Sequence, residues 1–193
     1  MSEDLHALAK RHDRWVNITV IAVFAVALLL GWRVKAAAEN RAVEVQVEDL
    51  KLRYPEGWVR AEVEPPLVLQ VQDRMARGFA TTLSVQRRPL PPDLPKPLAA
   101  VHQTLNLERA RLWNGYRELA EEPVTVGSRA GTRVTFAYVE TNSNPFLQTL
   151  PVVMRGEDYL FQQDDQAYVF TLTAAEPNYG RAHQALLVLA QSW

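Results

Sequence analysis

The side chains best suited to chemistry are four histidines and three pairs of adjacent acidic residues. No two histidines have the spacing of metal ligands; they are His6, His12, His102 and His183. The acidic pairs are Glu121-Glu122, Glu157-Asp158 and Asp164-Asp165. Acid–base catalysis or calcium binding requires several such groups to converge in a cleft, whereas adjacent acids at predicted turns are usually solvated. We therefore expect no catalytic residues, no metal site and no cofactor.

The other candidate nucleophiles do not change this expectation. Cysteine is absent, which excludes disulfides, thiolate metal sites and cysteine nucleophiles. His102 and His183 lie on predicted amphipathic helices, at the surface or at the edge of the core, where they could still approach each other in space. No nucleophile-elbow sequence surrounds any of Ser84, Ser128, Ser143 and Ser192. The sequence favours a protein that is not an enzyme, since an enzyme would need acids or histidines to meet in a cleft.

The longest apolar stretch runs from Trp15 to Trp32 and contains no charged side chain. Its polar side chains are Asn17 and Thr19, and a tryptophan stands at each end, where an amphipathic ring prefers the membrane interface. At about 1.5 Å per residue, a helix of roughly 18 residues spans about 27 Å, close to the hydrocarbon thickness of a bilayer. The pattern predicts a transmembrane helix, in which Asn17 and Thr19 could hydrogen-bond a neighbouring helix.

A cleaved signal peptide is the alternative, because basic residues precede the stretch and Ala36-Ala37-Ala38 follows it. The stretch is longer than a typical signal-peptide core, and residues that suit an interface separate it from the alanines: Trp32, Arg33 and Lys35. We therefore predict a retained anchor. The predicted parts are a tail over 1–14, the membrane helix over 15–32, a stalk over 33–42 and one domain over 43–193.

Basic residues flank both ends of the predicted membrane helix, so the positive-inside rule distinguishes poorly between its two possible orientations. The short N-terminal segment also carries the free amine, which favours an N-terminus inside the cell. We expect an inner-membrane protein whose domain lies on the exterior, periplasmic face, with the lipid bilayer and other membrane protein subunits as partners. The net charge of −1, from 21 basic and 22 acidic residues, gives no electrostatic footprint for nucleic acid.

The predicted domain alternates between strand and helix patterns. Apolar residues alternate with polar ones along several segments, and in one of them Val134, Phe136 and Tyr138 face the same way. Helical spacing appears after the proline-rich segment 89–97 and again after Pro177. We predict a turn at Gly156. Seven or eight strands, with one central and one terminal helix, predict an α+β fold in which helices pack on an antiparallel sheet.

Three features occur in a fixed order along the chain. They are the turn at Tyr54-Pro-Glu-Gly-Trp58, strands around a central helix, and a closing strand at 168–173 before a helix that ends Gln191-Ser-Trp193. In these features the chain resembles the PsbP-like superfamily over about residues 43 to 193. That superfamily also includes a Ran-binding nuclear import factor and mycobacterial LpqN-type lipoproteins.

The resemblance implies an α-β-α sandwich and binding to larger assemblies instead of catalysis. Plant members of the superfamily dock on the lumenal face of photosystem II. The resemblance gives no metal or cofactor ligands for this chain. It also places the chain, by analogy from fold, in a photosynthetic or respiratory complex.

Two groups of residues complete the prediction. A structural role explains the turn at Pro55, Gly57 and Trp58, because glycine permits a positive φ and the indole can be buried. Candidate partner contacts are Trp113, Tyr116, Asn144 and Phe146, which combine aromatic rings with polar loops. We predict a non-catalytic, single-pass accessory or scaffold subunit of a larger membrane complex. The alternative is a membrane-tethered module that binds a small molecule or lipid in an apolar cavity between sheet and helix.

Overall fold

The computed structural model describes residues 19–35, 41–76, 79–141 and 150–193. The chain forms two compact units, Met1–Arg41 and Ala42–Trp193. The first unit contains a helix over residues 19–35, and every residue of this helix is exposed. Among the residues that the structure describes, no helix is both long enough and apolar enough to cross a membrane. The predicted transmembrane helix is thus not confirmed, and part of it, including Trp15 and Asn17, lies outside the described residues.

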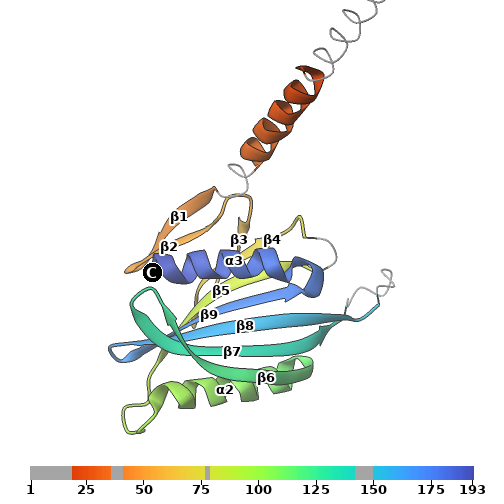
Figure 1. Cartoon of the computed structure of the whole chain (residues 1–193). Coiled ribbons are helices and arrows are strands. Elements are labelled where there is room, and N and C mark those ends of the chain that lie inside the picture. Colours follow the sequence, from red (N-terminus) through yellow and green to blue (C-terminus); the bar gives the residue numbers. More distant parts are fainter. Residues whose placement is uncertain (1–18, 36–40, 77–78, 142–149) are drawn as a thin grey trace, which may run out of the picture. The chain divides into compact units, whose positions relative to one another are not determined.

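The second unit is α+β, as predicted, and its strands are antiparallel (Figure 1). A seven-stranded sheet has the order β3-β4-β5-β9-β8-β7-β6, and β1 and β2 form a separate two-stranded sheet. The strands are β1 (Ala42–Val47), β2 (Leu50–Pro55), β3 (Val59–Arg60), β4 (Leu67–Asp73), β5 (Thr81–Pro89), β6 (Asn114–Val126), β7 (Arg129–Glu140), β8 (Val152–Gln163) and β9 (Gln166–Ala175). The helices are α2 (Pro97–Leu112) and α3 (Glu176–Ser192).

The two helices cover opposite faces of the large sheet. Successive side chains of a strand point to opposite faces, so the same strands can pack against both helices. Helix α3 packs on β9, β8 and β5, and it also contacts β2 of the small sheet. Helix α2 packs on β6 and β8. Figure 1 shows α2 and α3 on the two sides of the sheet, which is the α-β-α arrangement that the resemblance predicted.

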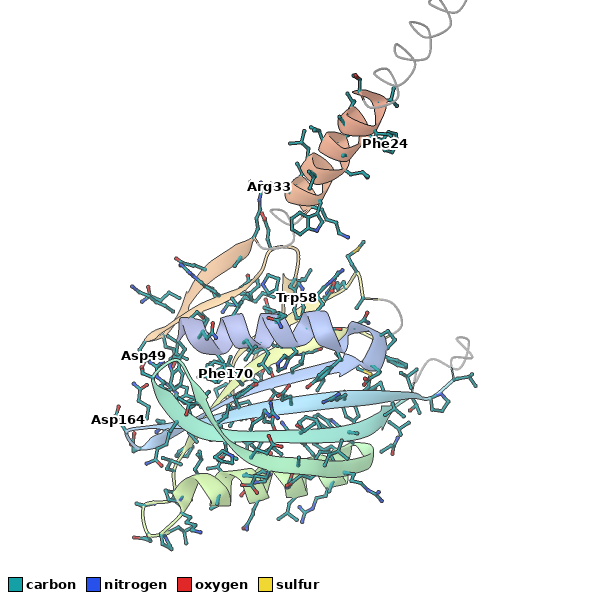
Figure 2. All side chains as sticks on the ribbon, viewed as in Figure 1. Phe24, Arg33, Asp49, Trp58, Asp164 and Phe170 are labelled. Carbon is teal, nitrogen blue, oxygen red and sulfur yellow. The ribbon has the colours of Figure 1, made fainter. Side chains whose placement is uncertain are left out.

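The larger apolar core lies between the large sheet and α3. It contains Leu186 and Leu189 of α3, and Phe170 of β9, which Figure 2 labels. The C-terminal Trp193 closes this core, with its ring centroid 5.3 Å from that of Phe170. Smaller cores lie on the α2 face, where Val101 and other apolar residues of α2 meet β7, β8 and β9. Each face of the sheet therefore carries an apolar core where a helix covers it.

The turn between β2 and β3 brings Trp58 back to the domain. The backbone N–H of Trp58 donates to the Pro55 carbonyl at 3.2 Å, and Gly57 has a φ of +96°. A positive φ at the third position is the geometry of a type II turn, which favours glycine. Trp58 is half-buried and packs against the core under α3.

The predicted turn at Gly156 is wrong. Strand β8 runs through Gly156 without a break, and the residue pairs with Phe136 of β7. A Cβ on Gly156 would overlap the aromatic ring of Phe136, so this glycine provides space for a core ring within a strand. The consequence is that the acidic pair after Gly156 lies in the middle of the sheet and not in a turn.

Candidate functional site

The acidic pair Glu157-Asp158 was expected to be solvated, and the structure corrects this expectation. Glu157 is 2% exposed and Asp158 is fully buried. Because neighbouring residues of a strand face opposite ways, Asp158 lies under α2 and Glu157 lies under α3. Each carboxylate meets a different set of partners, so the two do not form one acidic site.

Asp158 is held by Arg109 of α2 and Thr171 of β9. Arg109 donates from both terminal nitrogens to the two carboxylate oxygens, and one of these bonds measures 2.9 Å. Thr171 donates its hydroxyl to Asp158 at 2.7 Å and lies 3.3 Å from Arg109 Nη2. The guanidinium also stacks on Phe136, with Cζ 4.4 Å from the ring centroid. Burial by itself would lower the pKa of Arg109, but the Asp158 carboxylate raises that pKa above its ordinary value.

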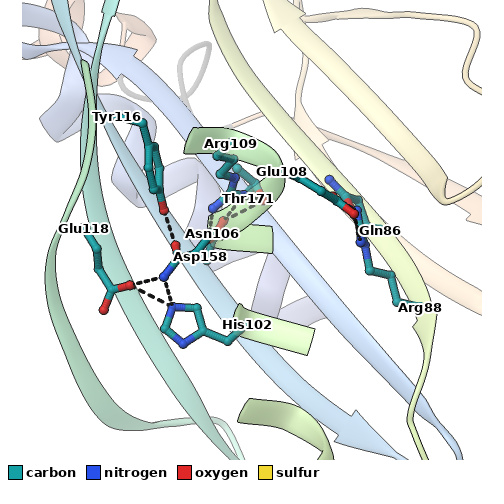
Figure 3. Close-up of polar contacts among 10 residues, drawn as sticks. All are labelled: Gln86, Arg88, His102, Asn106, Glu108, Arg109, Tyr116, Glu118, Asp158 and Thr171. Atoms are coloured by element: carbon teal, nitrogen blue, oxygen red, sulfur yellow. Dashed lines mark hydrogen bonds and ion pairs between the residues drawn. The ribbon is translucent and has the colours of Figure 1, made fainter. Parts of the chain in front are cut away.

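A second polar cluster joins α2 to β6 (Figure 3). His102 Nε2 lies 3.1 Å from Glu118 Oε2, and Asn106 donates its amide to the same carboxylate. Tyr116 donates its hydroxyl to Asn106. Burial raises the pKa of Tyr116. His102 is 6% exposed, so it is a buried member of a hydrogen-bonded cluster and not a surface side chain.

An ion pair between Arg88 and Glu108 lies at the edge of α2. Arg88 of β5 donates to both oxygens of Glu108, at 2.9 and 2.7 Å. The hydrogen bonds from Arg88 lower the pKa of Glu108 below its ordinary value. The geometry is the two-pronged pairing that arginine makes with carboxylates. Glu108 is thereby neutralised within the chain.

On the other face of the sheet, Glu157 is held by residues of α3. Tyr179 donates its hydroxyl to Glu157 at 2.5 Å, and His183 Nδ1 lies 2.8 Å from the same oxygen. Burial raises the pKa of Tyr179, and its hydrogen bond to the Glu157 carboxylate raises it further. His102 and His183 therefore lie on opposite faces of the sheet and do not approach each other. Each buried acid in these clusters meets donors from its own domain.

Beside α2 the sheet is not covered, and a groove of about 330 Å³ lies there. Its floor consists of β4, β5 and β9, and its wall is the C-terminal half of α2. Side chains of Gln70, Thr82 and Ser84 form part of the floor, while Leu112 and Trp113 line the end of the wall. The groove is open to solvent, and both polar and apolar side chains line it.

A second hollow, of about 420 Å³, lies where α3 begins. Trp58, Asp73 and Arg181 line it together with Thr81. Thr81 is 1% exposed, and its hydroxyl has no hydrogen-bond partner among the described residues. No group of three or more histidine and acidic side chains in the described part of the chain could hold a metal ion.

The structure places two of the predicted contact residues and leaves two undescribed. Trp113 stacks on Tyr138 with ring centroids 4.4 Å apart, and Tyr116 packs on Phe136 at 5.6 Å. Both rings are half-buried, so each keeps some surface for a partner. Asn144 and Phe146 lie outside the described residues. The role of these residues as partner contacts stays a prediction.

Sequence reasoning missed Arg109 and Asp158, although one signal was present. Arg109 follows Leu105 by four residues and therefore lies on the apolar stripe of its helix. A cation on such a stripe indicates a buried partner, because an unpaired buried charge is strongly unfavourable. Nothing in the sequence identified Asp158 as that partner.

Comparison with known proteins gives a fold. No family model and no curated protein matches the sequence. Among solved structures, the cyanobacterial PsbP (CyanoP) of Synechocystis sp. PCC 6803 aligns with 80% of this chain and 91% of its own, at 15% identity and a TM-score of 0.55. The Ran-binding protein Mog1p of Saccharomyces cerevisiae aligns with 79% of this chain and 94% of its own, at 14% identity and a TM-score of 0.50. The chain therefore contains a PsbP-like fold domain, as the resemblance predicted.

Proposed function

We propose that this chain is a non-catalytic accessory subunit of a larger membrane protein complex. The stretch from Trp15 to Trp32 anchors it in the cytoplasmic membrane as a single span, with the N-terminus inside. The PsbP-like domain lies on the exterior face and docks on partner subunits of a photosynthetic or respiratory complex. The chemistry of the complex belongs to those partners.

The exposure of the helix over residues 19–35 carries the anchoring part of the proposal. Its large apolar side chains, from Val20 to Val34, are each more than half exposed. Figure 2 shows Phe24 projecting from this helix. A continuous apolar surface of this kind marks a contact with lipid or with another protein. Both contacts are expected of a subunit that sits in a membrane complex.

The internal pairing of charges supports a non-catalytic role. Asp158, Glu157 and Glu108 are each hydrogen-bonded to side chains of the same domain. A general base needs a free lone pair that can reach the substrate. Here the carboxylate oxygens already accept hydrogen bonds from side chains of the domain, so fewer of their lone pairs are free. The similar yeast structure is described as Ran-binding, and the similar cyanobacterial one as PsbP. We extend a protein-binding role to this chain by analogy of fold.

Membrane fractionation of the full chain tests the anchor. We expect wild type to remain in membranes after an alkaline carbonate wash. A variant with Val26→Arg and Leu29→Arg should move to the soluble fraction, because each arginine in a membrane span costs about 2.5–3.5 kcal/mol. The matched control carries Val26→Ala and Leu29→Ala and should stay in the membrane. Wild-type chain in the soluble fraction would refute the anchor.

The absence of cysteine allows a direct test of orientation. Single cysteines are introduced as Ser2→Cys and as Glu64→Cys, which is exposed in the domain. A membrane-impermeant maleimide added to intact spheroplasts should label only the second variant. The reverse labelling would overturn the proposed orientation.

Native purification tests the accessory role. The tagged full chain is extracted in mild detergent and examined by native mass spectrometry. We expect a complex of defined stoichiometry that the two-arginine variant fails to form. Recovery of wild type as a lone monomer from its own membranes would contradict an accessory subunit.

A further inference from the structure

We propose that the groove beside α2 binds a neutral saccharide. This inference goes beyond the accessory role and does not depend on the membrane anchor. It rests on the hydrogen-bonding groups that the groove offers, on the charge that it lacks and on the apolar wall at one end. The three steps are independent observations of the same groove.

The groove floor carries side chains that lack a hydrogen-bond partner in the described part of the chain. Gln70 lies opposite Ser84 in the register of β4 and β5, and Thr82 lies two residues earlier on the same strand face. No side-chain hydrogen bond of Gln70, Thr82 or Ser84 occurs among the described residues. Ser84 is only 9% exposed. None of their polar atoms is among the buried, unpaired side-chain atoms of the described residues, so these amide and hydroxyl groups are open to the groove, where water or a ligand can bond to them.

The charged residues of the groove are neutralised before any ligand arrives. Arg109 is committed to Asp158, and the side chain of Arg109 is 7% exposed. Glu108 receives two hydrogen bonds from Arg88. Opposite charges therefore cancel along the wall. A charged ligand would have to break one of these pairs, whereas an uncharged ligand with many hydroxyl groups needs no such exchange.

The end of the wall is apolar. Leu112 is 78% exposed, and the half-buried Trp113 lies next to it. A pyranose ring has an apolar face of C–H groups and a rim of hydroxyls. The apolar wall and the amide and hydroxyl floor match these two surfaces. The groove volume of about 330 Å³ is at the lower end of the range of small-molecule sites, which suits a sugar of one or two rings.

Ligand-observed NMR and calorimetry on the full chain test the proposal. The detergent must be zwitterionic, because maltoside and glucoside detergents would compete as sugars. The probes are maltose, cellobiose and N,N′-diacetylchitobiose, with glucuronate and glucosamine as charged comparators. We expect at least one neutral disaccharide to bind and to receive saturation transfer from the protein, with weaker binding of both charged sugars.

Matched variants locate the binding in the groove. Gln70→Leu and Ser84→Ala each remove one hydrogen-bonding group from the floor and should weaken binding about 3- to 10-fold. The control is Gln72→Leu, which lies on the same face of β4 but outside the groove and should leave binding unchanged. Thermal unfolding of each variant verifies that it is folded. The proposal is overturned if none of the neutral disaccharides binds, if the charged sugars bind more tightly, or if the floor variants bind like wild type.

Discussion

Removal of Arg109 tests whether the buried pair with Asp158 holds α2 on the sheet. In the variant Arg109→Met, Asp158 keeps the hydroxyl of Thr171 as its one side-chain donor among the described residues and loses the positive charge opposite it. Breaking a buried ion pair from one side costs about 3–5 kcal/mol, because a charge stays buried without compensation. This is a large fraction of the stability of a typical domain, which is about 5–15 kcal/mol.

The assay is reversible urea unfolding of the full chain in detergent, followed by tryptophan fluorescence. The loss of about 3–5 kcal/mol is read from the urea curve, and for a unit of this size it corresponds, in a parallel thermal scan, to a fall in Tm of about 6–20 °C. Asp158→Leu should cost a similar amount, since it leaves the guanidinium buried and unpaired. The double variant removes both charges and should unfold within about 1–2 kcal/mol of wild type. Thr171 faces the groove, so its hydroxyl can then bond to water.

The control pair is Arg53 with Glu44, whose side chains are 56% and 68% exposed. Arg53→Met should cost less than about 1 kcal/mol, as solvent screens this pair. Single variants of Arg109 and Asp158 that cost no more than this control would refute the reasoning. So would single effects that simply add in the double variant, because additivity means that the two side chains do not interact.

Two further predictions concern the core and the response to pH. Gly156→Ala should cost about 1–3 kcal/mol in urea unfolding, because the new methyl overlaps Phe136; the control Gly180→Ala lies in α3 with open space and should be neutral or stabilising. Equal effects at the two glycines would contradict this. Tyr179 has a raised pKa in the folded state, so its contribution is complete below pH 10 and is lost as the pH rises above 10. The unfolding free energy of Tyr179→Phe should fall less steeply than that of wild type above pH 10, and identical slopes would show that Tyr179 ionises alike in both states.

The fold was predictable because a strand that is buried on one face alternates apolar and polar residues along its sequence. Val134, Phe136 and Tyr138 were predicted to share a face, and all three are buried. The ends of the elements were less well predicted. The helical spacing after the proline-rich segment did not predict where the central helix ends: α2 ends at Leu112, and Tyr116 lies on β6. A single residue, Trp113, separates α2 from β6, so no loop sequence marks the change from helix to strand.

The polar clusters could not be predicted, because they depend on long-range register. Gly156 before two acids suggested a turn, and only the pairing of β8 with Phe136 of β7 explains the glycine otherwise. Because β8 is continuous and successive side chains of a strand point to opposite faces, Asp158 lies on the α2 face and Glu157 on the α3 face. Arg109 and Asp158 are 49 residues apart in sequence. Local patterns carry no information about a contact of that range.

The groove and the cores on the α2 face lie on the same side of one sheet, and their composition shows which part the sequence leaves for solvent or ligand. Under α2 the face presents Val134, Leu160 and Val169, all fully buried. Beyond α2 the same face presents Thr82 and Ser84. If a helix of a partner normally covered the groove, we would expect the floor to carry an apolar cluster there too, as the sheet does under α2 and α3. The change from apolar to hydroxyl and amide side chains within one face therefore favours a polar ligand over a protein helix in this groove, and the proposed docking on partner subunits would then use other surfaces of the domain.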